Sequence, residues 1–294
     1  KSPRLSIPVM ASYSKTVSNP EYDPYDKDIK LKDKLANANG PQKDSIKNAA
    51  ADITTIKTLN FTNVRKQKTN GKKPKIYDIS NFDVSYSYLK IKSHTPLIEN
   101  NEITKHRYGL GYNFTPKPRY IEPFKKFFKK TKTHWFDLVK DFNFNPVPSG
   151  LSFRTSLDRT YSETQLRNNS GLAFQIDPTY IKTYTMARNY GLNWDLTRSL
   201  KLDFNADANA TIDEPTGRLD TREERDSVKE NLKRLGRLNR YHHSANVTYN
   251  LPLNKIPAAD WVSSNVRYGS DYSWQASPLY RDTIDDRIKD NPWG

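Results

Sequence analysis

The sequence contains no cysteine, and no window of it approaches eighteen consecutive apolar residues. Without cysteine the chain can form neither a disulfide framework nor a thiolate metal site. Without a long apolar run it has no candidate transmembrane helix, although strands of about 9–11 residues cross membranes with much weaker hydropathy. Hydrophobic residues make up only 35% of the 294 residues, which is little for a large buried core.

Aromatic residues, in contrast, are plentiful, at 12% of the chain with 18 Tyr and 5 Trp. This content excludes a disordered composition. A mean hydropathy of -0.90 combined with many aromatic residues is expected where strands have water on one side and lipid or a core on the other. The length permits one large all-β domain or two smaller ones.

The chain is strongly basic, with a formal net charge of +15. Lysine and arginine combined with aromatic residues are typical of nucleic-acid-binding surfaces. Here the basic residues spread over predicted connections, and the strand aromatic residues share a face with Leu, Val and Ala. We therefore expect no nucleic-acid partner, and we expect the positive charge to meet anionic lipid head groups at a membrane surface.

Alternation of apolar and polar residues predicts about nine strands, because successive side chains of a strand point to opposite faces. The clearest runs are FDVSYSY (82–88) and YGLGYNF (108–114). The run at 53–65 is weak, since only Leu59 and Phe61 are in phase. The predicted strands lie near 4–14, 53–65, 80–92, 105–115, 151–165, 182–197, 199–212, 240–251 and 261–277.

The most regular segment is a hairpin at 189–215, NYGLNWDLTRSLKLDFNADANATIDEP, with a tight turn at 197–199. One parity carries large apolar residues such as Trp194 and Leu202, and the other carries acidic residues such as Asp195. Each arm is therefore predicted to have one apolar face and one hydrated face.

The predicted connections differ in length. The one at 15–52 is long and polar, and those at 93–104, 166–181 and 213–239 are polar and of moderate length. If the strands run up and down, all four fall at one end, and mostly shorter connections such as 252–260 fall at the other. This asymmetry is typical of outer-membrane barrels.

Two of the connections are predicted to contain helices. In the later one, Thr221 and Glu224 have capping-box spacing, and Gly236 is the expected C′ residue. In the connection at 116–150, the segment 122–144 places Phe and Trp residues among six lysines. This pattern is typical of an interfacial amphipathic helix, and an ordinary helix that covers a sheet edge has the same pattern.

No motif in the sequence indicates catalysis, a metal or a cofactor. None of the five histidines has the i, i+4 partner of a zinc site, and His242 and His243 are predicted to point to opposite faces of a strand. Asp195, Asp203 and Asp207 share one face, and paired carboxylates can perform acid–base chemistry. Acidic residues are also expected in a water-filled lumen without catalysis, so we predict no enzyme and no cofactor.

The positions of the aromatic residues favour a membrane barrel over a soluble β-sandwich. Tyr and Trp gather toward strand ends, as in the girdles of membrane barrels, whereas a sandwich core places aromatic residues in mid-strand. The predicted lumen-facing residues are Asp83, Arg154, Asp158, Asn193, Asp195, Lys201, Asp203, Asn205, Asp207, Arg267 and Asp271. The predicted lipid-facing or girdle residues are Tyr86, Tyr112, Phe114, Tyr190, Trp194, Leu202, Phe204, Tyr268, Tyr272 and Trp274.

The sequence starts directly in a strand pattern and stops in loop-like sequence, IKDNPWG. We expect residues 1–294 to be one segment of an antiparallel up-and-down transmembrane β-barrel domain in a longer chain. A barrel of about eight strands is filled by its own side chains, whereas open lumens need about sixteen or more. Small residues predicted to face inward, such as Ser85 and Gly111, suit the wall of a wide pore.

Five long irregular phrases spread over most of the chain: NPEYDPYDKDI (19–29), LNFTNVRK (59–66), DFNFNPVPSGLSFRTSLDR (141–159), YGLNWDLTRSLKLDFNADANATIDEPTGR (190–218) and LPLNKIPAADW (251–261). These phrases resemble the SprA/Sov family. The resemblance implies an outer-membrane protein of a Gram-negative (Bacteroidota) bacterium. In that family a very large single-chain barrel is the protein-conducting translocon of the type 9 secretion system and also serves gliding motility.

The resemblance also implies partners. They are a PorV-type barrel protein that closes a lateral opening, a periplasmic plug protein, and secreted proteins in transit. Membrane lipid and lipopolysaccharide would surround such a barrel. The family offers no catalytic motif that could be assigned to residues of this chain.

Two other classes of protein fit parts of the pattern. Another outer-membrane barrel, such as a nutrient receptor or a lipopolysaccharide exporter, would have a plug domain or a jellyroll in flanking sequence. A soluble basic all-β module that binds polyanions would stay in solution without detergent and would bind with a steep salt dependence.

Overall fold

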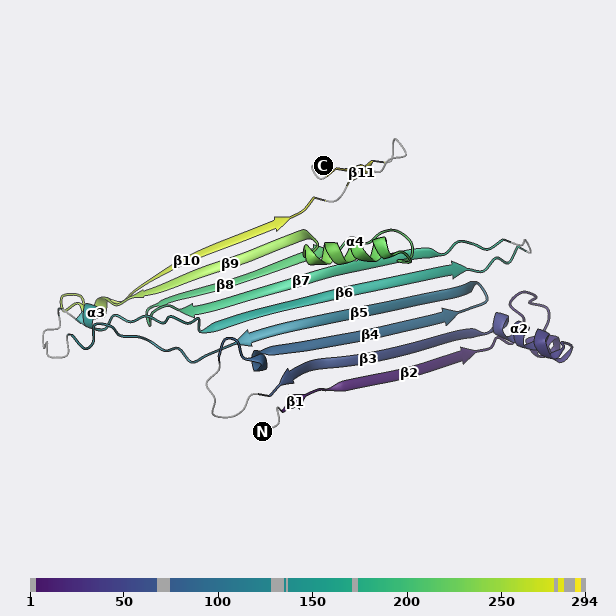
Figure 1. The fold of residues 1–294 in the computed structure, drawn as a ribbon, viewed down its shortest axis with the longest axis horizontal. Helices are drawn as coiled ribbons and strands as arrows, with labels where there is room; N and C mark the ends of the chain where they lie inside the picture. Colours follow the sequence, from purple (N-terminus) through teal and green to yellow (C-terminus); the bar gives the residue numbers. More distant parts are fainter. Residues whose placement is uncertain are drawn as a thin grey trace.

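The computed structural model describes residues 4–67, 75–127, 135, 137–170, 174–277, 280–282 and 289–291. It confirms the predicted all-β fold: ten strands form one antiparallel up-and-down sheet, in which nearly every strand pairs with its neighbours in sequence (Figure 1). The sheet strands are β1 (Leu5–Ser6), β2 (Val9–Ser18), β3 (Asp52–Lys66), β4 (Phe82–His94), β5 (Ile98–Phe114), β6 (Gly150–Leu166), β7 (Thr179–Asp195), β8 (Leu200–Thr211), β9 (Arg237–Leu251) and β10 (Ser264–Gln275).

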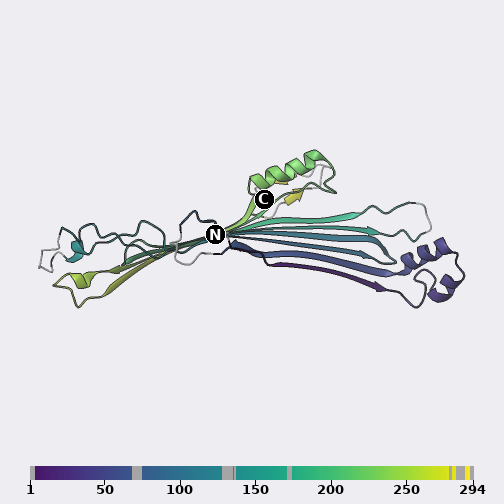
Figure 2. The same ribbon diagram turned by 60° about the horizontal axis from the view of Figure 1, so that its bottom comes forward.

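The sheet of the described residues is open, with two free edges. The short β1 and the longer β2 both pair with β3 and together form one edge, and β10 forms the other. A separate pair, β11 (Tyr280–Asp282) and β12 (Lys289–Asn291), lies outside this sheet. Figure 2 shows the sheet nearly edge-on and strongly twisted, as expected for long paired strands.

One expectation about strand boundaries is confirmed and another is wrong. The strand expected near 53–65 is present as β3, which pairs along its length with β2 on one side and β4 on the other, although its alternation is weak. The expected connection at 93–104 is mostly strand, because β4 continues to His94 and β5 already begins at Ile98.

The weak pattern of β3 and the missed start of β5 have the same physical cause, a change of phase along the strands. Ile56, Ile91 and Ile103 pair side by side across β3, β4 and β5, and they lie on the face opposite to Phe61 and Tyr86. Toward the ends of these strands the apolar side chains therefore switch faces. A single alternation pattern detects only one half of each strand.

The expected difference between long and short connections is also wrong. The two longest connections, 19–51 and 115–149, lie at opposite ends of the strands, and the turn between β4 and β5 is among the shortest. The first of these holds α1 (Leu31–Ala36) and α2 (Gly40–Ala50), so the predicted polar loop at 15–52 is partly helical and starts after β2.

The helix expected over 122–144 is described only in part, because residues 128–134 and 136 lie outside the described residues. The described part contains one helical turn, α3 (Asp137–Lys140). Short 3-10 turns, η1 (Ile79–Asn81) and η3 (Leu253–Lys255), precede β4 and follow β9. Among the described residues no helix combines the length and the apolar character that a membrane crossing requires.

The helix expected in 213–239 is confirmed as α4 (Arg222–Lys233), with Thr221 as N-cap and a complete capping box with Glu224. Its C-terminal end differs by one residue from the prediction. Leu235 occupies C′ with a φ of 65°, and Gly236 follows as C″ with a φ of 70°. The amide of Gly236 donates to the carbonyl of Asn231 at 2.9 Å, which closes a Schellman motif.

The hydrophobic core of the described residues is small. It consists of Tyr184, Met186 and Ala210 on the sheet and Ile212 directly after β8, with Val228 and Leu232 of α4 packed against them. The accessible surface of the chain is 21441 Å², whereas a compact monomer of 34.1 kDa exposes about 13,000 Å². Most of the large apolar side chains are therefore not buried within the chain.

Candidate functional site: a polar face and an apolar band

The register assigns every predicted site residue to one of two faces, because partners in neighbouring strands point to the same side. All predicted lumen-facing residues share one side, the polar face: Asp83, Arg154, Asp158, Asn193, Asp195, Lys201, Asp203, Asn205, Asp207, Arg267 and Asp271. All predicted lipid-facing or girdle residues share the other side, the aromatic face: Tyr86, Tyr112, Phe114, Tyr190, Trp194, Leu202, Phe204, Tyr268, Tyr272 and Trp274. What each face meets stays a prediction.

Large apolar residues of the aromatic face form an apolar band that crosses the strands obliquely. On β3 the band is centred on Phe61. The residues paired with Phe61 on each following strand lead to Ala210 on β8. On β10 the band is centred on Ser270, which lies between two tyrosines. The residues paired with Ser270 across β9 lead to Phe204 on β8. Over the seven steps from β3 to β10, the band therefore shifts by six residues along the strands.

This shift can be converted into an angle. With about 3.4 Å per residue along a strand and about 4.8 Å between strands, the band deviates by about 30° from the direction perpendicular to the strands. Strands of membrane barrels tilt by about 35–45° from the barrel axis. A band that lies parallel to a membrane plane must therefore deviate from the direction perpendicular to the strands by a similar angle.

Aromatic side chains pack against one another within the band. Ring centroids lie 4.9 Å apart for Phe82 and Tyr112 and 5.2 Å apart for Phe153 and Tyr190. Many band residues are nevertheless open to the outside, and Tyr268 is 69% exposed. Such an exposed apolar surface requires a partner that covers it.

Phe114 departs from the predicted set. It lies on the aromatic face but is only 3% exposed, so it cannot contact lipid. It is the last residue of β5, where the chain enters the connection 115–149. That connection returns across this end of the face, where the indole of Trp194 donates to the carbonyl of Asn145 at 2.9 Å. The sequence could not show this return, because it depends on contacts between distant segments.

The same connection is fixed to the turn between β7 and β8. Arg198 of that turn lies 2.8 Å from Glu122, which also pairs with Lys125 at 2.6 Å. The hydrogen bond from Lys125, followed by the neighbouring Arg198 guanidinium, lowers the pKa of Glu122. Glu122 therefore stays ionised and holds the connection against the strand ends.

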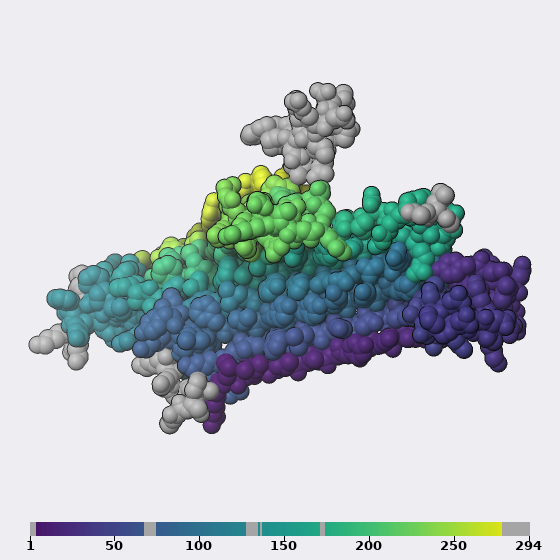
Figure 3. Space-filling view, turned by 45° about the vertical axis from the view of Figure 1, so that its right-hand side comes forward, coloured from purple at the N-terminus to yellow at the C-terminus, as the bar shows by residue number. Residues whose placement is uncertain are grey.

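A second part of the aromatic face is covered by α4, which sequence reasoning did not predict. Figures 1 and 2 show α4 lying on one side of the sheet, over β7 and β8, and Figure 3 shows it as a raised ridge. Two ion pairs hold the preceding segment on β6: Arg159 with Glu214 at 2.6 Å, and Arg218 with Glu163 at 2.5 Å. The apolar band therefore ends beneath α4 on this part of the sheet.

Charges of both signs alternate over the polar face. Asp158 pairs with Arg107, Asp195 lies 3.9 Å from Lys201, and Asp271 lies 3.7 Å from His242. These side chains are mostly exposed, and exposed pairs contribute little to stability. They keep the surface hydrated without forming a strong binding site for one charge.

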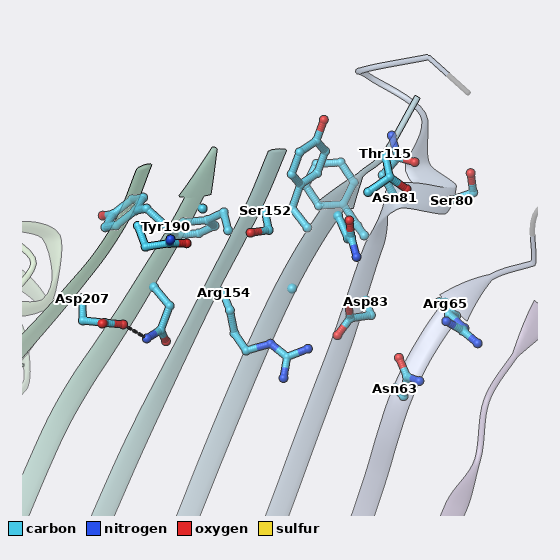
Figure 4. Close-up of a pocket in the computed structure, with 18 residues that line it drawn as sticks. Asn63, Arg65, Ser80, Asn81, Asp83, Thr115, Ser152, Arg154, Tyr190 and Asp207 are labelled. Carbon is cyan, nitrogen blue, oxygen red and sulfur yellow. Dashed lines mark hydrogen bonds between the residues drawn. The ribbon is translucent and has the colours of Figure 1, made fainter. Parts of the chain in front are cut away.

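A hollow of the polar face with a volume of about 610 Å³ opens near the middle strands (Figure 4). Arg154 lies between Asp83 and Asp207, and Arg65 lies beyond Asp83. The hollow exists because small residues lie beneath the charged ones. A Cβ added at Gly111 would overlap the carboxylate of Asp83.

The chemistry of the polar face is that of a hydrated wall. Among the described residues, no group of three or more His, Asp or Glu side chains could hold a metal ion. His242 and His243 pair with residues of opposite faces, as expected for neighbours in a strand.

No protein-family model matches the chain, and no curated protein matches it. The resemblance to the SprA/Sov family therefore stays a prediction, as does each activity and partner that it implies.

Proposed function

We propose that the chain forms part of the wall of a very large β-barrel in the outer membrane of a Bacteroidota bacterium. In this proposal the barrel conducts secreted proteins in the type 9 secretion system and supports gliding motility. The oblique apolar band is the observation that carries the proposal. A membrane requires apolar side chains at one level across tilted strands, and a soluble sheet has no such requirement.

The exposed surface argues against a soluble polyanion-binding module. A soluble protein rarely exposes an apolar patch larger than a few hundred square ångströms. Here the band continues over most of the sheet, and the exposed fractions of Val266 and Tyr272 are 53% and 48%. In the described residues no second sheet covers it, as a β-sandwich would require.

The small residues of the polar face support a wide barrel. In a barrel of about eight strands, inward side chains fill the interior. Gly109, Gly111 and Gly191 on this face would leave such an interior empty. The free edges at β2 and β10 carry unpaired backbone groups, which additional strands of a larger barrel would pair.

Transport through such a lumen would be passive. The mixed charges of the polar face interact weakly with a passing polypeptide, and energy would be supplied elsewhere. A PorV-type barrel and a periplasmic plug protein are the proposed partners. Neither a cofactor nor a catalytic group is part of the proposal.

A photo-crosslinking amino acid at position 203 or at position 202 tests the channel. Asp203 and Leu202 are neighbours on β8 that lie on opposite faces, so each position is the control for the other. In growing cells position 203 is expected to crosslink to secreted proteins, and position 202 is expected to crosslink to none. Crosslinks to secreted proteins at both positions, or at neither in cells that still secrete, would exclude the proposed path.

A further inference from the structure

Four lysines gather on the aromatic face just beyond the apolar band, on three neighbouring strands. Lys15 of β2, Lys57 of β3, and Lys90 and Lys92 of β4 form this lysine cluster. Lys57 is paired with Lys90, and Thr55 lies between Lys15 and Lys92 in the next register row of the same face. The four ammonium groups therefore belong to one small area of the sheet.

The lysine cluster has more positive charge than its surroundings neutralise. Like charges directly opposite each other in a sheet are destabilising, and Lys57 and Lys90 are such a pair. Glu102 pairs with Lys90 at 2.6 Å. In the part of the chain that the structure describes, Lys15, Lys57 and Lys92 form no ion pair, although the ammonium group of Lys57 lies 5.8 Å from the centroid of the Tyr13 ring. An anion from outside the chain would relieve this repulsion.

The position of the cluster indicates which anion. On β3 and β4 the last band residues are Leu59 and Tyr88, and the lysines follow them on the same face. Lys57 and Lys92 are exposed, so their long side chains are free to reach along the surface. At the same level of β3 and β4 the opposite face carries Ile56 and Ile91, so on these two strands the lysines lie on the aromatic face, whereas Lys105 of β5 lies on the polar face.

We propose that the lysine cluster binds the phosphate groups of membrane lipid whose acyl chains lie on the apolar band. This inference rests on the membrane barrel proposed above. A lipid in that position has its apolar part beside Leu59 and Tyr88 and its phosphate at the level of Lys57. Several ammonium groups within one area suit a lipid that carries more than one phosphate.

Native mass spectrometry of the full-length protein in an uncharged detergent tests this site. The probe is diphosphorylated lipid A, and inorganic phosphate and a neutral diacylglycerol are the comparison ligands. The test variant is Lys57→Gln/Lys92→Gln. The matched control is Lys105→Gln/Lys201→Gln, which removes two exposed lysines from the polar face.

Each basic side chain near an anionic membrane surface contributes about fivefold to binding, so the test variant should bind lipid A about 25-fold more weakly. The control should stay within about twofold of the unchanged protein, and the neutral lipid should not distinguish the variants. Equal binding by test and control variants overturns the inference, as does equally strong competition by inorganic phosphate.

The heat-dependent gel mobility of each variant separates the two proposals. A folded membrane barrel shifts on boiling, so a normal shift without a difference in lipid binding overturns the lysine site alone. A full-length protein that stays in solution without detergent and shows no shift overturns the barrel, and the lysine site with it.

Discussion

At the scale of single residues, neighbours in one strand lie on opposite faces of the sheet. Leu202 pairs with Trp194 and Val247 on the aromatic face, whereas Asp203 pairs with Asn193 and Asn246 on the polar face. Their backbones have the same surroundings, so a difference between substitutions at the two positions measures the two faces.

Leu202→Arg should cost about 2–4 kcal/mol of barrel stability if this position lies near the bilayer midplane, because a cation on the lipid face loses its hydration. Asp203→Asn should be nearly neutral, since water reaches the polar face. The fraction of protein that acquires the heat-dependent mobility of a folded barrel measures both effects. Equal losses for the two variants would contradict the assignment of the faces.

At the scale of elements, the sequence predicts the side of a strand better than its length. The two predicted sets of site residues on β4 to β10 occupy two different faces of the sheet, because alternation is a local property of the backbone. The start of β5 at Ile98 could not be predicted, because Ile103 lies on the opposite face from Tyr108 and changes the phase of the pattern. The coverage of Phe114 and Met186 depends on connections that return over the sheet, and no local pattern contains that information.

The end of α4 depends on glycine at position 236. With a φ of 70°, a side chain at Gly236 is strained, and a Cβ there would lie 2.7 Å from the carbonyl oxygen of Thr211. Gly236→Ala should therefore destabilise α4 by about 1–3 kcal/mol. Hydrogen exchange of the α4 amides should become faster, while exchange in β4 and β5 stays unchanged. Unchanged exchange in α4 would contradict the role of this residue.

The start of α4 should depend on pH through Glu224. Backbone and side-chain hydrogen bonds with Thr221 lower the pKa of this carboxyl. A carboxyl with a lower pKa in the folded state stabilises that state above its unfolded pKa of about 4.3, and this stabilisation is lost as the pH falls through the folded pKa.

Protection of the α4 amides should therefore decrease on going from pH 7 to pH 3. The comparison variant is Glu224→Gln, which keeps the capping partner but does not titrate. It should lose less protection than the unchanged protein over the same interval. An identical decrease in both proteins would show that another group causes the pH dependence.

At the scale of the whole molecule, the main feature is a sheet with two different faces and little core. One face carries the apolar band, and the other carries mixed charges over small residues, part of which Figure 4 shows. Hydrophobic burial is the main source of folding free energy, and here much of it must come from outside the chain. A lipid bilayer on the aromatic face would supply it, and a second protein layer is the alternative.

The depth of neighbouring β8 residues in lipid distinguishes these two sources most directly. The chain contains no cysteine, so Phe204→Cys and Asn205→Cys give single labelling sites on the aromatic and the polar face of full-length protein in vesicles. A fluorophore at position 204 should be quenched strongly by lipids with brominated acyl chains, and one at position 205 should be quenched weakly. Absence of quenching at position 204 would mean that protein, not lipid, covers the apolar band, and the membrane-barrel account would be wrong.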